Sequence, residues 1–186
     1  MNVYENCPVF ENEKFLLRRS VKSDAKDLLK VYSDAAAVPF FNSDNCHGDN
    51  FHYSTIEKME KALDFWEMSY QNGYFVRWTI LDKAANEAVG TIELFHRDAE
   101  DYFTNCGILR LDLRSDFEKS GAIENILPLI LGSAFEIFNC DKIATKAVLD
   151  AVQRQSALKN LGFKSSGEKL TGNDGTAYGD YFVLLK

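Results

Sequence analysis

The sequence predicts an α/β protein of the α+β kind, with a mixed, mostly antiparallel sheet of about six to seven strands and helices on both faces. Apolar residues recur at helical spacing in segments 56–70 and 123–138. Strand-like runs lie between these segments, and the turns that join them are too short for crossover connections. The 186 residues suffice for one full core and contain no linker-like tract, so residues 1–186 are expected to form a single domain.

The N-terminal part predicts one strand, two helices and a long loop. Residues 14–19 are typical of a strand, and Ser23 is expected to cap the first helix. Residues 39–53 are rich in Asn, Asp, Gly and aromatic residues, which predicts a loop. Residues 54–57 show a capping-box pattern that begins the second helix, and Asn72 followed by glycine ends it.

The remaining elements include three strands with short connections, which favour an antiparallel meander. A long amphipathic helix follows Gly121, and Pro128 should kink or delay it because proline lacks the N–H of a helical hydrogen bond. A strand, a short helix ending at Phe163 and two further strands complete the chain. The strands are expected at 75–81, 89–96, 103–113, 142–149, 163–166 and 177–185.

The composition restricts the classes of partner. A formal net charge of −7 argues against binding to nucleic acids or anionic membranes, and it favours a cationic acceptor such as an amine. No apolar run has transmembrane length, and no secretory signal is visible at the N-terminus. The four cysteines are scattered, as in a reduced compartment. We therefore expect a cytoplasmic protein, monomeric or homodimeric, with no nucleic-acid or membrane partner.

The last third of the chain has the most informative order of elements. Strand 107–113 is followed by a polar loop, Gly121 and a long helix, and then by strand 142–149 and a short helix that ends in Leu161-Gly162-Phe163. In this order the chain resembles the GCN5-related N-acetyltransferases (GNAT), and the ribosomal-protein (RimJ/RimL-like) branch in particular. The resemblance implies a GNAT-like sheet, acetyl-coenzyme A as the co-substrate and no metal.

The resemblance also implies where acetyl-coenzyme A binds. Peptide N–H groups of the strand before the loop would hold the acetyl carbonyl and the pantetheine, and the turn into the helix would hold the pyrophosphate. Glu118 stands where relatives carry a cation or an amide, so Lys119 would supply the positive charge. Arg154 takes the position of a serine in relatives, and Ala151 that of an asparagine. The cofactor-binding residues expected are Leu111, Leu113, Lys119, Ser120, Gly121, Ala122, Ile123 and Arg154.

Three residues are candidates for proton transfer. Glu93 shares a strand face with apolar residues, which would raise the pKa of its carboxyl and suit a general base; the alternative is an ion-paired or surface carboxylate. Asp112 is the second candidate; the alternative is an ion pair with Arg110 or with a cation on another strand. Tyr181, or Tyr178 nearby, could protonate the thiolate of coenzyme A; the alternative is a core or surface aromatic residue.

The loop at 39–53 would cover the acceptor side of the cleft. Its polar and aromatic residues suit an acceptor pocket, although such loops can also be plain surface. Cys46, His47 and His52 suggest a metal, but no fourth ligand stands at suitable spacing, so no metal site is expected. The substrate-binding residues expected are Phe40, Phe41, Asn42 and Tyr53.

The leading hypothesis is an N-acetyltransferase that moves acetyl from acetyl-coenzyme A to a primary amine by direct attack. The acceptor would be a protein N-terminus, a polyamine or another small amine. The alternative is a catalytically inactive GNAT-like binding or regulatory module that has lost acetyl-coenzyme A binding, and Glu118, Ile123, Pro128 and Ala151 favour it. A third hypothesis is an acyltransferase with a longer acyl donor.

Overall fold

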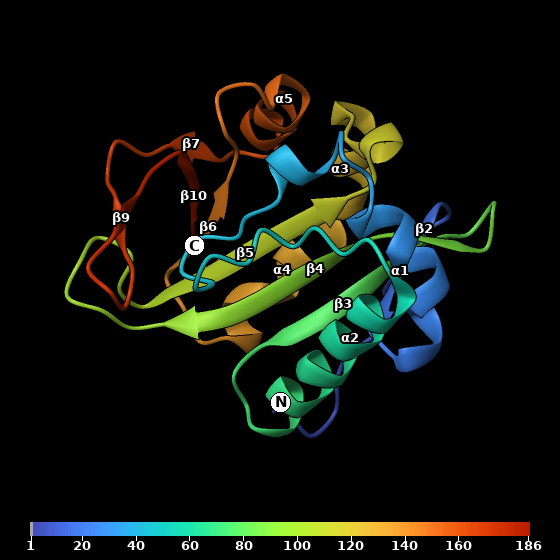
Figure 1. Ribbon diagram of the computed structural model, residues 1–186. Helices are drawn as coiled ribbons and strands as arrows, with labels where there is room; N and C mark the ends of the chain where they lie inside the picture. The colour runs from blue at the N-terminus through green and yellow to red at the C-terminus, as the bar shows by residue number, and fades with distance from the viewer. Residues whose placement is uncertain (1) are drawn as a thin grey trace.

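The computed structural model describes residues 2–186 and contains an eight-stranded mixed sheet in the order β1-β2-β3-β4-β5-β6-β10-β7 (Figure 1). All neighbouring strands are antiparallel except β5 and β6, which run parallel. Strands β8 and β9 form a separate hairpin. The strands are β1 (Phe10–Glu11), β2 (Phe15–Arg19), β3 (Val76–Asp82), β4 (Glu87–Arg97), β5 (Cys106–Leu113), β6 (Lys142–Lys146), β7 (Lys164–Ser165), β8 (Leu170–Thr171), β9 (Ala177–Tyr178) and β10 (Tyr181–Leu185).

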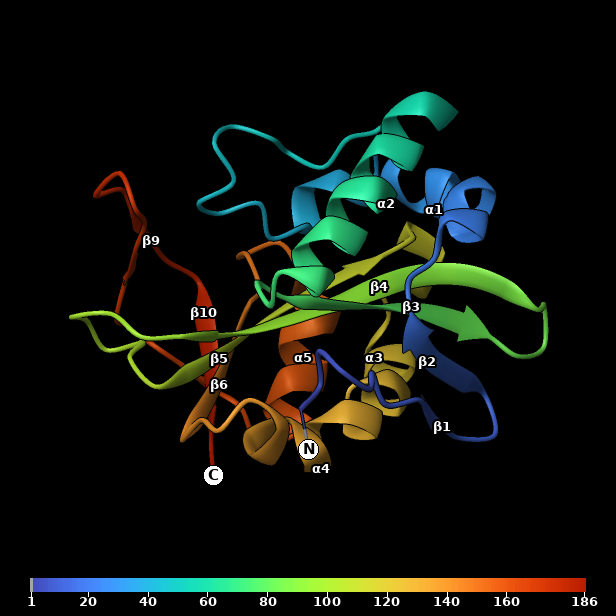
Figure 2. The same cartoon turned by 90° about the horizontal axis from the view of Figure 1, so that it is seen from below.

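Helices cover both faces of this sheet. Helices α1 and α2 lie on one face, and α3, α4 and α5 lie on the other (Figure 2). The helices are α1 (Ala25–Tyr32), α2 (Ile56–Gln71), α3 (Ser120–Ile126), α4 (Pro128–Ile137) and α5 (Val152–Asn160), with 3-10 turns at Lys22–Asp24, Val38–Phe40 and Ser115–Phe117. Within residues 2–186, no helix is both long enough and apolar enough to span a bilayer.

The predicted mixed, mostly antiparallel sheet with helices on both faces is confirmed, and its details differ in a few places. The sheet has eight strands because β1 and β7 are two-residue edge strands, too short to show a periodicity. The predicted strand 177–185 is split at Asp180, whose φ is +64°, so β9 leaves the main sheet and pairs with β8. Strand β6 ends at Lys146 rather than at residue 149.

The helix boundaries follow local chemistry. The expected helix after Gly121 is two helices, because Pro128 lacks an N–H and begins α4 at its first position. Asp24, not Ser23, stands at the N-cap of α1, since a 3-10 turn precedes that helix. Thr55 caps α2 by accepting a hydrogen bond from the N–H of Lys58 at 3.3 Å, so the expected capping box is absent there.

The parallel strands β5 and β6 separate before β5 ends. Their pairing runs from Cys106 opposite Lys142 to Leu109 opposite Thr145, and β5 then continues to Leu113. The N–H of Arg114 donates to the carbonyl of Val89 in β4, so the N–H groups of Arg110 and Asp112 also point toward β4, and those of the residues between them point toward β6. The N–H groups of Leu111 and Leu113 therefore point into the gap that opens toward β6. We call this gap the wedge; it is bounded by residues 110–113 on one side and Lys146 on the other.

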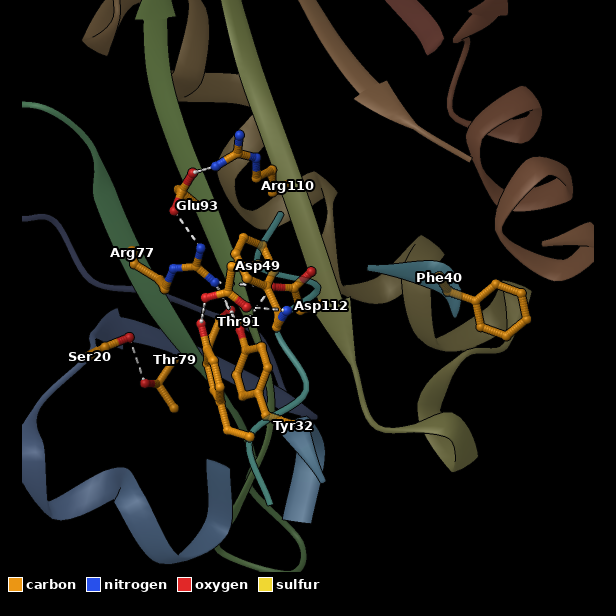
Figure 3. A network of polar contacts seen from close by, with 12 residues as sticks. Ser20, Tyr32, Phe40, Asp49, Arg77, Thr79, Thr91, Glu93, Arg110 and Asp112 are labelled. Carbon is orange, nitrogen blue, oxygen red and sulfur yellow. Dashed lines mark hydrogen bonds and ion pairs between the residues drawn. The ribbon is translucent and has the colours of Figure 1, made fainter. Parts of the chain in front are cut away.

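A buried layer of charges lies between the sheet and helices α1 and α2 (Figure 3). Cross-strand register places Glu93 of β4 between Arg77 of β3 and Arg110 of β5. The Arg77 guanidinium, on a residue only 4% exposed, pairs with Glu93 and, at 3.0 Å, with Asp112. It also donates to Tyr32 Oη at 2.8 Å and to Thr91. We call these six residues, Tyr32, Arg77, Thr91, Glu93, Arg110 and Asp112, the charge network.

We predict that Arg77→Met lowers the free energy of unfolding by about 3–5 kcal/mol, because it leaves the buried Asp112 carboxylate without a countercharge and Glu93 with Arg110 alone. Urea denaturation followed by circular dichroism measures the change. Lys22→Ala, which breaks the exposed pair with Asp64, serves as the control and should barely move the midpoint. An Arg77→Met midpoint equal to that of the control would show that the network contributes little.

Gly90 of β4 allows a second prediction, because a Cβ there would lie 2.3 Å from the carbonyl oxygen of Asp112. Gly90→Ala should therefore force β4 and β5 apart and destabilise the fold by about 1–3 kcal/mol. Gly132 in α4 has open space around its position and is the matched control. Gly132→Ala should stabilise the protein by about 0.5–1 kcal/mol, so the two alanines should shift the melting temperature in opposite directions.

Candidate active site

A polar cluster forms where β6 and β10 meet the connection between α1 and α2. Tyr181 pairs in register with Lys146, and its hydroxyl donates to Asp44 Oδ2 at 3.1 Å. The Asn42 side-chain amide donates to the same hydroxyl at 3.4 Å. Lys146 Nζ lies 2.7 and 2.8 Å from the two Asp44 oxygens. We call Asn42, Asp44, Lys146 and Tyr181 the Tyr181 cluster.

The Tyr181 hydroxyl keeps its proton in this setting. Burial and the negative charge of Asp44 raise the pKa of Tyr181 above its usual value near 10. A neutral phenol at the start of β10 can donate a proton but is a poor base. Tyr178, the other tyrosine considered, lies half-buried in β9, with Lys146 Nζ 5.9 Å from its ring.

Two cavities open beside this cluster. The first has a volume of about 490 Å³ and is lined by Asp44, Arg110 and Tyr181 together with the β4–β5 turn and residues 170–173. The second has a volume of about 360 Å³ and lies between the α1–α2 connection, α2 and the charge network. Asn45 and Arg110 line both cavities, so they adjoin.

Arg110 joins the charge network to the Tyr181 cluster. Its guanidinium donates to Glu93 Oε1 at 2.6 Å and to the carbonyl of Asp44 at 2.9 Å. Within residues 2–186, the Nε atoms of Arg77 and Arg110 are buried without a hydrogen-bond partner. Both arginines also line the second cavity.

Glu93 lines the second cavity, but its electrostatics differ from the sequence-based expectation. Burial raises the pKa of Glu93, while the Arg77 and Arg110 guanidiniums together outweigh burial and hold that pKa below its usual value. The expected raised pKa is therefore wrong, because the cross-strand neighbours are cations rather than apolar groups. Both oxygens of Glu93 are bonded by arginines, which matches the ion-paired alternative.

Asp112 is fully buried and lines neither of these two cavities. Its Oδ2 accepts from Tyr32 at 2.8 Å and from Arg77 at 3.0 Å, so it pairs with a cation of another strand. Burial raises the pKa of Asp112, and Arg77 offsets part of that effect. Its Oδ1 has no hydrogen-bond partner among the described residues. The side chain thus holds Arg77 in place.

The four expected acceptor residues lie in different surroundings. Tyr53 lines the second cavity, and Asn42 touches Tyr181. Phe41 packs against Tyr32 with ring centroids 5.2 Å apart. Phe40 points away from the charge network, toward the opposite helical layer (Figure 3). Cys46 and His47 line the second cavity, yet within residues 2–186 no three His, Cys, Asp or Glu side chains gather to hold a metal ion.

The expected cofactor residues surround the wedge only in part. The N–H groups of Leu111 and Leu113 face it, and Gly121 has open space beside its backbone. Lys119 is exposed at the N-cap of α3. The N–H of Ser120 already donates to Gln153 of α5 at 3.1 Å. Ala122 is half-buried, and Ile123 is fully buried in the core.

A buried ion pair fills the space between α3 and α5. Arg154 Nε and Nη2 donate to the two Glu118 oxygens, each at 2.7 Å, and Nη1 donates to the carbonyl of Phe40 at 2.9 Å. The Arg154 and Glu118 side chains are 1% and 6% exposed. The open strand edge thus suits a coenzyme A arm, whereas Glu118 and Arg154 occupy the adjoining space.

Sequence reasoning missed both this pair and the Asp44–Lys146 pair, whose partners are 36 and 102 residues apart. A signal for the first was present, because Arg154 lies on the buried face of α5 with Ala157 and Leu158. A charged residue on an apolar helix face requires a buried partner, although the pattern does not say which one.

The comparisons with known proteins agree with this geometry. The family described as the acetyltransferase (GNAT) domain matches residues 14–164. No curated protein matches the chain.

Solved structures of ribosomal-protein acetyltransferases share the fold. The ribosomal-protein-S5-alanine acetyltransferase from Vibrio fischeri is 18% identical, covers 96% of both chains and superposes with a TM-score of 0.69. RimL, the ribosomal L7/L12 alpha-N-protein acetyltransferase in complex with coenzyme A, is 14% identical over 96% of this chain and 98% of that one, with a TM-score of 0.69. RimJ from Mycobacterium smegmatis, in complex with a coenzyme A disulfide, is 15% identical over 91% and 79%, with a TM-score of 0.66.

These likenesses establish the architecture, and the family match covers most of the chain from β2 to the start of β7. The separated β5–β6 pair and the Leu-Gly-Phe end of α5 stand inside the matched segment. The protein therefore belongs to the acetyltransferase (GNAT) domain family and has the fold of its RimJ/RimL-like branch.

Proposed function

We propose that this protein is an N-acetyltransferase that moves an acetyl group from acetyl-coenzyme A to a primary amine. The observation that carries the proposal is the wedge, where the Leu111 and Leu113 N–H groups face an open strand edge beside the Tyr181 cluster. The family match and the acetyltransferases of the same fold support it. Residues 2–186 include no membrane-spanning helix, which is compatible with action in the cytoplasm.

The chain's own groups suit such a transfer. Acetyl-coenzyme A, when bound, supplies an acetyl thioester that an amine can attack directly. The N–H groups of Leu111 and Leu113 would donate hydrogen bonds to a carbonyl oxygen and stabilise the negative charge that develops on it. Tyr181 would hold the proton that the departing thiolate needs, since its raised pKa keeps the phenol neutral.

The first cavity suits an amine acceptor. Its charged lining comprises Asp44, Asp98, Glu100 and Asp101 against Arg97 and Arg110, so carboxylates exceed guanidiniums. This excess favours a cationic ammonium group, which then loses its proton to water or to a carboxylate. The structural neighbours acetylate ribosomal proteins, which supports a peptide N-terminus as the acceptor ahead of a polyamine or another small amine.

Glu93 is better suited to hold Arg110 in place than to remove a proton. Its pKa is lowered by two guanidiniums, and a carboxylate with a low pKa is a weak base. We therefore assign Glu93 a positioning role and Asp112 a structural one beneath Arg77. The residue that deprotonates the amine then acts from the first cavity, or an ordered water molecule does.

The second candidate function is a binding or regulatory module without acetyl transfer. The buried Glu118–Arg154 pair favours it, because it fills space next to the wedge. A third possibility is an acyltransferase that uses a longer acyl donor. The thiol-release assay described below resolves it when longer acyl thioesters replace acetyl-coenzyme A. The sequence and the fold place no limit on the length of the acyl chain.

Release of free thiol from acetyl-coenzyme A tests these functions. We expect thiol release to depend on an amine when the enzyme is offered N-terminal peptides, spermidine-like polyamines and small amines in parallel. Mass spectrometry of the acceptor should show a gain of one acetyl group. Absence of turnover with every amine, together with no heat of binding at millimolar acetyl-coenzyme A, would rule out the transferase function.

Tyr181→Phe tests the proton donor. We expect kcat to fall by about 10²-fold or more, because the thiolate then leaves without general-acid assistance. The loss in kcat should be smaller at high pH when the acyl donor has a more acidic thiol, because such a thiolate leaves more easily without a proton. Tyr178→Phe is the matched control and should keep kcat within about threefold of the wild type. Equal kcat values for the two variants would remove Tyr181 from the mechanism.

A further inference from the structure

The Glu118–Arg154 pair lies beside the wedge. Helix α5 lies on the face of the sheet opposite α1 and α2 (Figure 2), yet Arg154 donates to the carbonyl of Phe40 from the α1–α2 connection. This contact joins the two helical layers that the sheet separates. Glu118 follows Leu113, the last residue of β5, by five residues, which keeps the pair near the end of that strand.

The two side chains of the pair are almost fully buried, and their hydrogen bonds are satisfied. The Glu118 carboxylate accepts from Nε and Nη2 of Arg154 in a bidentate arrangement, and the Phe40 carbonyl accepts from Nη1. An anion that enters the wedge would meet the Glu118 carboxylate and find the arginine already paired. Bidentate arginine geometry fits a phosphate as well as a carboxylate, so a phosphate could replace Glu118 on Arg154.

No residue of α3 or α5 lines either of the two cavities on the acceptor side. The Gly121 backbone, by contrast, is open to solvent at the margin of this region. Glu118 lies in the short turn between Phe117 and the N-cap Lys119, where a single change of backbone and rotamer would move its carboxylate to water.

We propose that Glu118 is an autoinhibitory latch that competes with the phosphate groups of coenzyme A for Arg154. In the closed form, Glu118 binds Arg154, and the two side chains fill the space beside the wedge. In the open form, Glu118 turns to solvent, and Arg154 pairs with a phosphate of the ligand. The apparent affinity for coenzyme A is then the intrinsic affinity reduced by the fraction of molecules in the open form. This inference rests on the proposed use of coenzyme A by this protein.

The latch predicts opposite changes in coenzyme A affinity when Glu118 or Arg154 is substituted. Glu118→Gln removes the competing charge, so coenzyme A should bind about tenfold more tightly, as expected when one charge-assisted hydrogen bond becomes available to the ligand. Arg154→Gln removes the phosphate partner and should weaken binding by about tenfold. A passive structural pair would instead give equal or uniformly weaker binding in both variants.

Isothermal titration calorimetry with coenzyme A and with pantetheine tests the latch. Glu118→Gln should tighten binding of coenzyme A and leave that of pantetheine unchanged, because pantetheine has no phosphate. Glu136→Gln removes one exposed carboxylate from α4 and is the matched control for net charge. Circular dichroism verifies folding, and Glu118→Ala replaces Glu118→Gln if the latter is unfolded.

The outcomes separate the latch from the function. Coenzyme A binding by Glu118→Gln that is no tighter than that of the wild type, or Arg154→Gln binding as tightly as the wild type, overturns the latch. Thiol release by the wild type in that case leaves the transferase function intact. Tight binding by Glu118→Gln alone, with no binding or turnover by the wild type, supports the latch and removes the transferase function from the wild-type chain. No binding by any variant overturns the latch.

Discussion

The Arg77 guanidinium is the group on which the arrangement of the central strands depends. It reaches from β3 to a carboxylate on each of the next two strands, and it stacks 4.2 Å from the centre of the Trp66 ring of α2. A buried cation without these partners would be very costly, so the strands and the helical layer must meet in one register. A slip of one residue would turn Glu93 and Asp112 to the opposite, apolar face of the sheet.

This constraint extends from the fold to the acceptor side of the site. Glu93 is held by Arg77 and in turn holds Arg110, whose second bond goes to the Asp44 carbonyl. Asp44 is thereby fixed beside Tyr181 and Lys146, although it belongs to a loop with little regular structure. A chain of charge-assisted hydrogen bonds thus connects the centre of the sheet to the phenol that would serve the leaving group.

The side of the site proposed for the acetyl donor, at the β5–β6 edge, is built from backbone groups instead. Strands β5 and β6 separate and leave peptide groups unpaired by the ladder, which gives a fixed set of donors independent of side-chain identity. The side chains around that edge decide whether a ligand can reach it. With Glu118 and Arg154 in contact, two groups that could attract or repel phosphates cancel each other. The proposed coenzyme A site thus rests on the backbone, whereas the proposed latch would make the side chains control entry to it.

Local patterns in the sequence determined the helices, most of the strands and the strand–loop–helix order of the family, because these depend on neighbours a few residues apart. They also indicated Tyr181 and Asn42, although not that their side chains touch. The pKa of Glu93 could not be predicted, since its cross-strand partners Arg77 and Arg110 come from other strands and only the register sets them beside it. The same holds for Asp44 with Lys146 and for Glu118 with Arg154. The energy of a charge depends on its distance to other charges in space and on the exclusion of water, and only the tertiary structure decides both.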